Sequence, residues 1–97
     1  MWEKGWSINM KKIFITKGSP EMEEGMVSEW KKEEGEEISQ DEVIVEVETD
    51  KAVVPIKAEI SGFLHILVKD GDFASLTGPI GIIFQSKEEY QKHIKNM

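Results

Sequence analysis

Five consecutive residues, Glu48-Thr49-Asp50-Lys51-Ala52, carry the clearest chemistry in the sequence, an amine beside carboxylates and a hydroxyl. Before this stretch every second residue of 43–48 is a valine, with Ile44, Glu46 and Glu48 between the valines, and after it the apolar phase falls on Val54, Ile56 and Ala58. This alternation is the period of half-buried strands. An antiparallel hairpin with Asp50 and Lys51 as its two-residue loop accommodates both runs. The pattern therefore places Lys51 at the protruding tip of a hairpin.

One register of this hairpin puts all of its small apolar residues on the same face. A shift of one residue would set the apolar side chains of one strand opposite the polar side chains of the other. The expected opposite pairs are Val47 with Val54, Val45 with Ile56, Val43 with Ala58, and Thr49 with Ala52.

The turn chemistry at the tip favours a function for the lysine. Two-residue loops usually contain glycine, because both central residues often need a positive φ. The Asp50-Lys51 loop gives up this advantage, which suggests that the ammonium group is needed there. Many lysines at hairpin tips are only solvated charges that keep a loop soluble, so the tip by itself leaves both interpretations open.

Composition narrows the class of protein. The chain has 97 residues, which is enough for one small domain, and a net charge of -7, which argues against nucleic-acid binding. The absence of cysteine excludes disulfides, thiolate metal sites and a cysteine nucleophile. His65 and His93 have no ligand partner nearby in sequence, so a zinc site has little support. The sequence shows neither a nucleophile–base constellation nor a phosphate-binding loop, so nothing in it indicates an independent enzyme.

No apolar run reaches membrane-spanning length, and the first residues have neither the layout of a secretory signal nor the arginine-rich character of a transit peptide. We therefore expect a protein that does not contact membranes. Its expected location is the cytoplasm, or the mitochondrial matrix if the source is eukaryotic.

The remaining chain predicts an all-β fold. Short strands separated by charged or glycine-containing turns are typical of a sandwich or flattened barrel. A weak repeat at an offset of 36 residues, in which Gly35-Glu36 matches Gly71-Asp72, predicts two sheets related by an approximate two-fold. Trp30 is expected in the core, and Pro55 and Pro79 at strand ends or edges. The other expected strands cover residues 11–17, 26–32, 36–39, 63–68, 73–76 and 80–84.

The two ends of the chain read differently from its middle. Residues 1–10 form an extension that carries Trp2 and Trp6, and residues 86–97 predict a short helical tail, with residues 11–85 as the domain between them. Ser86 with Glu89 fits a capping box. Tyr90 and Ile94 lie four residues apart on one helix face, through which the helix is expected to dock.

Several motifs in order resemble the lipoyl domains of 2-oxo acid dehydrogenase complexes, over roughly residues 11 to 85. The hairpin tip Glu48-Thr49-Asp50-Lys51-Ala52 resembles the attachment motif of that family. The other matching motifs are Ser19–Gly25, Trp30 with Lys32–Glu36, Ser61-Gly62, Val68–Asp72 and Pro79-Ile80.

The resemblance implies a flattened barrel of two four-stranded antiparallel sheets, with the lysine hairpin opposite the termini. It implies lipoate in amide linkage to Lys51 as the cofactor, and recognition of Glu48, Thr49, Asp50 and Ala52 by the ligase and the partner enzymes. The chain would then be a carrier of acyl groups and electrons and not an enzyme. The implied partners are a lipoate ligase or lipoyl transferase, a thiamine-diphosphate-dependent dehydrogenase, an acyltransferase and dihydrolipoamide dehydrogenase.

The sequence departs from the family at three places. Asp41 and Thr77 stand where glycine is usual. Asp41 tolerates the left-handed region, and Gly78 is expected to take the turn beside Thr77. The stretch from Gly62 to Gly71 is one residue short, so a distorted strand is expected there.

Three other functions remain as alternatives. An unmodified lipoyl-like protein-interaction module would not require the intact tip motif, because exposed tip residues contribute little to stability. A biotin carrier sets its lysine between methionines, whereas Lys51 lies between Asp50 and Ala52. A glycine-cleavage carrier also holds lipoate, but its lysine motif differs and its chain is longer.

Overall fold

A computed structural model describes residues 10–95, and the predicted extension with Trp2 and Trp6 lies outside the described residues. Eight strands are followed by one helix, α1, at Lys87–Lys95. No helix in residues 10–95 has the length and hydropathy of a membrane span. The strands are β1 (Met10–Ile13), β2 (Glu24–Trp30), β3 (Glu37–Ile38), β4 (Val43–Glu48), β5 (Val53–Lys57), β6 (Gly62–Ile66), β7 (Phe73–Ser75) and β8 (Gly81–Phe84).

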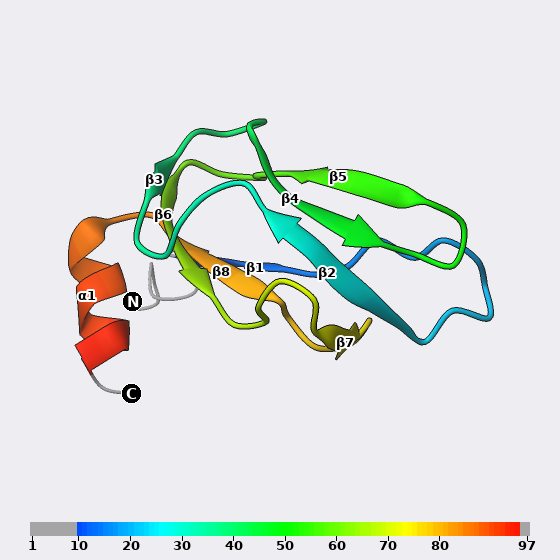
Figure 1. Ribbon diagram of the computed structural model, residues 1–97. Helices are drawn as coiled ribbons and strands as arrows, with labels where there is room; N and C mark the ends of the chain where they lie inside the picture. Colours follow the sequence, from blue (N-terminus) through cyan, green and yellow to red (C-terminus); the bar gives the residue numbers. More distant parts are fainter. Residues whose placement is uncertain (1–9, 96–97) are drawn as a thin grey trace, which may run out of the picture.

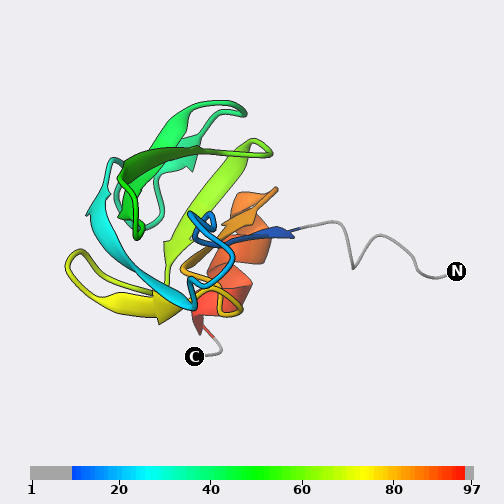
Figure 2. The same ribbon diagram turned by 90° about the vertical axis from the view of Figure 1, so that its right-hand side faces the viewer.

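The strands form two four-stranded antiparallel sheets, as expected. One sheet has the order β1-β8-β6-β3, which we call sheet A, and the other has the order β5-β4-β2-β7, which we call sheet B. The two curved layers face each other around the core (Figures 1 and 2). Replacing each strand by the strand four places away in the chain converts one order into the other. The predicted approximate two-fold is therefore present in the topology.

The two-fold extends to the tight turns. Gly35 and Gly71, which are 36 residues apart, have φ values of 81° and 87°. The Gly35 N–H donates to the carbonyl of Leu64, and the Gly71 N–H donates to the carbonyl of Val27, both at 2.7 Å. Each left-handed glycine thus ties the turn of its own half to a strand of the other half.

Two carboxylates also form matching hydrogen bonds between the halves. Asp70 accepts a hydrogen bond from the Trp30 N–H at 3.0 Å, and Glu34 accepts one from the Ile66 N–H at 2.7 Å. The pair Glu34 and Asp70 and the pair Trp30 and Ile66 each differ by 36 positions. Both side chains satisfy a backbone donor where a strand ends.

The core lies between the two sheets. Trp30 belongs to it, with 9% of its surface exposed, and its indole N–H donates to the Val68 carbonyl at 2.8 Å. Burial of its large apolar surface is stabilising because the one polar atom has a partner. The largest fully buried side chains are Ile38, Ile44, Leu64, Ile80, Ile83, Val27, Val45 and Val47.

Most of the expected strands are confirmed, with boundaries that shift by a few residues. Pro55 lies in edge strand β5 and Pro79 lies before β8, as predicted. Ile15 is buried although β1 ends at Ile13. Asp41 adopts a φ of 73°, as expected for an aspartate in place of glycine. Among the described residues the positive φ values belong only to Asp41, Gly35 and Gly71, so Gly78 does not take a left-handed turn.

Two expectations about register are wrong. Val43 lies opposite Lys57 and not Ala58, because the β4–β5 register shifts between Val43 and Val45. This irregularity also lets the intervening Ile44 side chain become fully buried.

The strand expected to be distorted, β6, pairs with β8 without a register shift. The corresponding shift occurs instead in β2, between Val27 and Glu29. The extra residue therefore lies in strand β2, in the first half of the domain, where the register shift accommodates it, and its counterpart β6 in the second half pairs without such a shift.

Candidate lysine attachment site

The hairpin tip is built as the sequence predicts. Val47 pairs with Val54 and Val45 pairs with Ile56. The Thr49 N–H donates to the Ala52 carbonyl at 2.9 Å, which closes the two-residue loop of Asp50 and Lys51. The tip lies at one end of the molecule, and α1 lies at the other (Figure 1).

Thr49 holds this loop together with its side chain. Its Oγ1 accepts hydrogen bonds from the N–H groups of Lys51 and Ala52, both at 3.1 Å. The same hydroxyl donates to the Ala52 carbonyl at 2.9 Å. Side-chain hydrogen bonds of this kind stabilise a turn whose central residues lack glycine. The backbone that carries the lysine is therefore fixed without a positive φ.

A second loop supports the tip from the side. The Ser19 hydroxyl donates a hydrogen bond to the Asp50 carboxylate, from a residue 31 positions earlier in the chain. A Cβ added to Gly18 would come within 2.3 Å of Asp50 Oδ1 and 3.0 Å of Thr49 Oγ1. A larger residue at position 18 would therefore require the Asp50 side chain to shift.

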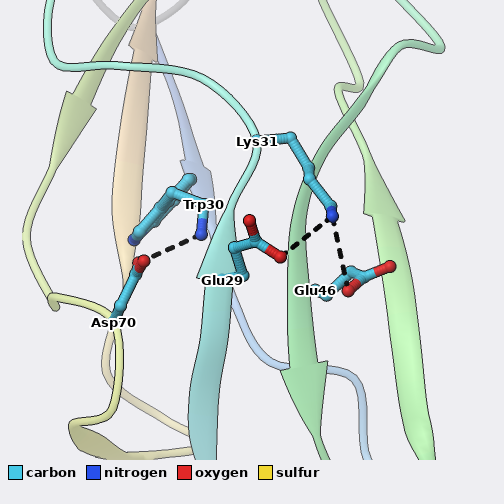
Figure 3. Close-up of polar contacts among 5 residues, drawn as sticks. All are labelled: Glu29, Trp30, Lys31, Glu46 and Asp70. Atoms are coloured by element: carbon cyan, nitrogen blue, oxygen red, sulfur yellow. Dashed lines mark hydrogen bonds and ion pairs between the residues drawn. The ribbon is translucent and has the colours of Figure 1, made fainter.

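The outer face of the hairpin is held to its neighbour by charge. Lys31 Nζ lies 3.0 Å from Glu29 Oε1 and 3.6 Å from Glu46 Oε1 (Figure 3). Glu46 belongs to β4 and Glu29 to the adjacent strand β2. Hydrogen bonding to Glu29 raises the pKa of Lys31, and Glu46 adds to the effect. Because these groups are exposed, the network contributes modestly to stability.

Lys51 itself is exposed. Among the described residues its ammonium group makes no hydrogen bond and no ion pair. Of the predicted recognition residues, Glu48, Asp50 and Ala52 are exposed, and Thr49 is half-buried because of its role in the turn. The arrangement presents a primary amine on a rigid loop, with space around it for a long substituent.

A separate polar cluster lies at the opposite end, under α1. Glu34 Oε2 lies 2.8 Å from His65 Nδ1 and accepts a hydrogen bond from the Tyr90 hydroxyl at 2.7 Å. His93 of α1 lies near His65, with ring centroids 5.2 Å apart. The sequence predicted the contact of Tyr90, but it gave no role to His93 or Glu34.

This cluster anchors the helix and does not form a metal centre. In residues 10–95 no three histidine or carboxylate groups come close enough to hold a metal ion. Ser86 accepts the Glu89 N–H at 3.1 Å, which confirms the predicted helix cap. Phe84 packs against Tyr90 and His93 with centroid separations of 6.2 Å and 5.0 Å. Ile94 is half-buried on the same helix.

Comparison with known proteins places this geometry in a family. Residues 11–83 match the biotin/lipoyl family described as Biotin-requiring enzyme. A solved structure, the lipoyl domain of the 2-oxoglutarate dehydrogenase complex from Azotobacter vinelandii, superposes with a TM-score of 0.66 at 30% identity. The match covers 77% of this chain and 96% of that domain.

Similar sequences occur within much longer proteins. The dihydrolipoyllysine-residue acetyltransferase component of the mitochondrial pyruvate dehydrogenase complex of Dictyostelium discoideum is 38% identical over 97% of this chain. The pyruvate dehydrogenase E1 component subunit beta of Rhizobium meliloti is 39% identical over 72% of it. The chain spans 15% and 16% of the length of these two relatives.

The fold, the lysine hairpin and these matches define a carrier domain of the biotin/lipoyl class. Within that class the chain belongs to the lipoyl domains of 2-oxo acid dehydrogenase complexes.

Proposed function

We propose that Lys51 is the attachment site and that it carries lipoate in amide linkage to its Nζ. The observation that supports this most strongly is the position of Lys51 in a fixed two-residue loop at the far end of the barrel. An exposed amine that contacts no side chain within residues 10–95 is free to react with an activated carboxyl group. Lipoate would supply a disulfide that accepts an acyl group and an electron pair.

The residues of the chain then act by positioning. Thr49 fixes the backbone that carries the substituent, and Ser19 restrains the Asp50 carboxylate beside it. A rigid base leaves the motion to the lysine and lipoyl chain, which lets the reactive end reach several active sites. Glu48, Asp50 and Ala52 are the exposed residues from which a ligase or partner would recognise the tip.

The proposed partners follow from the family. They are a lipoate ligase or lipoyl transferase, a thiamine-diphosphate-dependent dehydrogenase, an acyltransferase and dihydrolipoamide dehydrogenase. We place the carrier in the compartment of such a complex, which is the cytoplasm or, in a eukaryote, the mitochondrial matrix.

Intact mass after incubation with lipoate ligase, ATP and lipoate tests the attachment. We expect one added lipoyl group on the native chain and none on Lys51→Ala. Lys57→Ala is the matched control, because Lys57 is an exposed lysine at the other end of the same hairpin strand. Its mass should rise like that of the native chain.

Thermal unfolding of each variant shows whether the fold is intact. Lys51→Ala should unfold like the native domain, because replacing an exposed surface side chain changes stability by no more than about 0.5 kcal/mol. A folded native domain that gains no lipoyl group would contradict the proposal and favour an unmodified interaction module. A lipoyl group on folded Lys51→Ala would assign attachment to another lysine.

A further inference from the structure

The outer face of sheet B carries an unusual row of side chains directly behind the lysine tip. Val53 of β5 pairs with Glu48 of β4, Glu48 pairs with Met26 of β2, and Met26 pairs with Phe73 of β7. Residues that pair directly across antiparallel strands share one face of the sheet. Val27 and Val47, their neighbours along the strands, are fully buried, so the row points outward.

Three of these four side chains are apolar and exposed to solvent to different degrees. Phe73 is 66% exposed and Val53 is 52% exposed, while Met26 is half-buried between them. Exposed aromatic and methionine side chains are enriched at protein interfaces. A phenylalanine in this position contributes little to the core and costs solubility, so its role must be sought outside the domain.

The surroundings of the row are acidic. One hollow of about 240 Å³ is lined by Glu24, Glu48, Asp50 and Phe73, among other residues. A second, larger hollow beside it is lined by acidic residues of the same region, Glu21, Glu23, Glu24 and Asp50. No lysine among the described residues lines either hollow. The ammonium group of Lys51 is a positive charge beside these carboxylates, because it neighbours Asp50 in the loop.

Attachment of lipoate changes this balance of charge. Forming the amide at Lys51 Nζ removes its positive charge, which makes the end of the hairpin, with its Glu48 and Asp50 carboxylates, more negative. A basic partner surface consequently binds the lipoylated domain better than the unmodified one. A ligase meets the cationic form, whereas an enzyme that uses the lipoyl group meets the anionic form.

Resting on the proposed function, we propose that the row of Val53, Glu48, Met26 and Phe73 docks the 2-oxo acid dehydrogenase that acylates the lipoyl group. The partner surface presents an apolar depression for Phe73 and an arginine or lysine opposite Glu48. The lipoyl chain itself is the same on every such carrier. Residues beside its base are therefore where a partner enzyme distinguishes one carrier from another.

The test measures acylation of the lipoylated domain as its concentration is varied, with purified pyruvate dehydrogenase and 2-oxoglutarate dehydrogenase components as the probes. In the assay the 2-oxo acid is oxidatively decarboxylated, its acyl group bonds to one sulfur, and the disulfide is reduced to the second thiol. The comparison uses whichever of the two enzymes acylates the native lipoylated domain faster. With that enzyme, Phe73→Ser and Met26→Thr should each lower kcat/KM at least tenfold, mainly through a higher KM. Glu48→Gln should reduce the dependence of kcat/KM on salt.

Leu67→Ser is the matched control, because Leu67 is 42% exposed but follows β6 of sheet A. Its kcat/KM should stay within twofold of the native value. The rate of lipoylation by the ligase should be unchanged in Phe73→Ser, Met26→Thr and Leu67→Ser. Unaltered kcat/KM in Phe73→Ser and Met26→Thr would overturn the docking surface while leaving lipoyl attachment intact.

Two further outcomes would also overturn it. A parallel loss of lipoylation rate would assign the row to the ligase. A lack of acylation of the native lipoylated domain by both enzymes would exclude this class of partner. Failure of the native chain to accept lipoate at all would be seen first, by mass, and would count against the proposed function itself.

Discussion

At the scale of single residues, Thr49 does the work that glycine does in most two-residue loops. Its hydroxyl oxygen accepts hydrogen bonds from the N–H groups of Lys51 and Ala52, and the hydroxyl donates one to the Ala52 carbonyl. The loop therefore tolerates a lysine at its tip without left-handed backbone. The threonine in the tip motif thus has a structural reason that is independent of recognition.

Replacing this hydroxyl should loosen the tip. We expect Thr49→Val to lower the free energy of unfolding by about 1–2 kcal/mol, because three hydrogen bonds of the turn are lost and water replaces them only in part. Urea unfolding measures the change. Thr16→Val is the control, since Thr16 is exposed and makes no side-chain hydrogen bond within the described residues. Equal stabilities of the two variants would show that the hydroxyl does not hold the loop.

At the scale of elements, Glu34 joins a turn, a strand and the helix. It accepts hydrogen bonds from the Ile66 N–H and the Tyr90 hydroxyl and contacts His65. Burial raises the pKa of Glu34, but the hydrogen bonds from Ile66, His65 and Tyr90 outweigh it, and the net pKa is lowered. Burial and the hydrogen bond to Glu34 raise the pKa of Tyr90 to about 12.

These shifts predict how stability depends on pH. A lowered pKa in the folded state means that the contribution of Glu34 is complete above its ordinary pKa of 4.5 and is lost as the pH falls through the lower, folded value. A raised pKa means that the contribution of Tyr90 is complete below pH 10 and is lost as the pH rises towards 12.

Unfolding free energies of the native chain and of Glu34→Gln, measured from pH 7 to pH 3, test this. The difference between them should be constant down to about pH 5 and should shrink below pH 4.5. Glu33→Gln is the control, because Glu33 is an exposed neighbour in the same turn. A difference that stays constant to pH 3 would contradict the proposed hydrogen-bonded carboxylate.

The elements that the sequence predicted best are those with a strict period. The alternation around Lys51 was sufficient to place the hairpin and two of its pairs, because register is set by which residues must be buried. The irregularity that buries Ile44 was not predictable, since an inserted residue has no signal in a period-2 pattern.

The helix was only partly predictable. Ser86 and Glu89 indicated its start, and the spacing of Tyr90 and Ile94 indicated its inner face. The partner of Tyr90, Glu34, is 56 positions away, and nothing local marks it. The 36-residue repeat held the missing signal, because it aligns Glu34 with Asp70 and thereby marks both as turn carboxylates.

At the scale of the whole molecule, the approximate two-fold relates two ends of similar backbone structure, but only one of them is covered by the helix. The same turn geometry occurs in both halves, with Gly35 and Gly71 at matching places. One end carries the exposed hairpin, and the other is covered by α1 (Figure 1). In Figure 2 the tip end of the molecule faces the viewer. A symmetric barrel thus presents the Lys51 hairpin at one end only.

Whether the domain carries lipoate on Lys51 is tested by the mass of the protein isolated from the cells that make it. Peptide mapping of that protein assigns any modification to one of its lysines. We predict one lipoyl group on the peptide that contains Lys51 and no lipoyl or biotinyl group on any other lysine. An unmodified Lys51, or a biotinyl group at that position, would contradict the account.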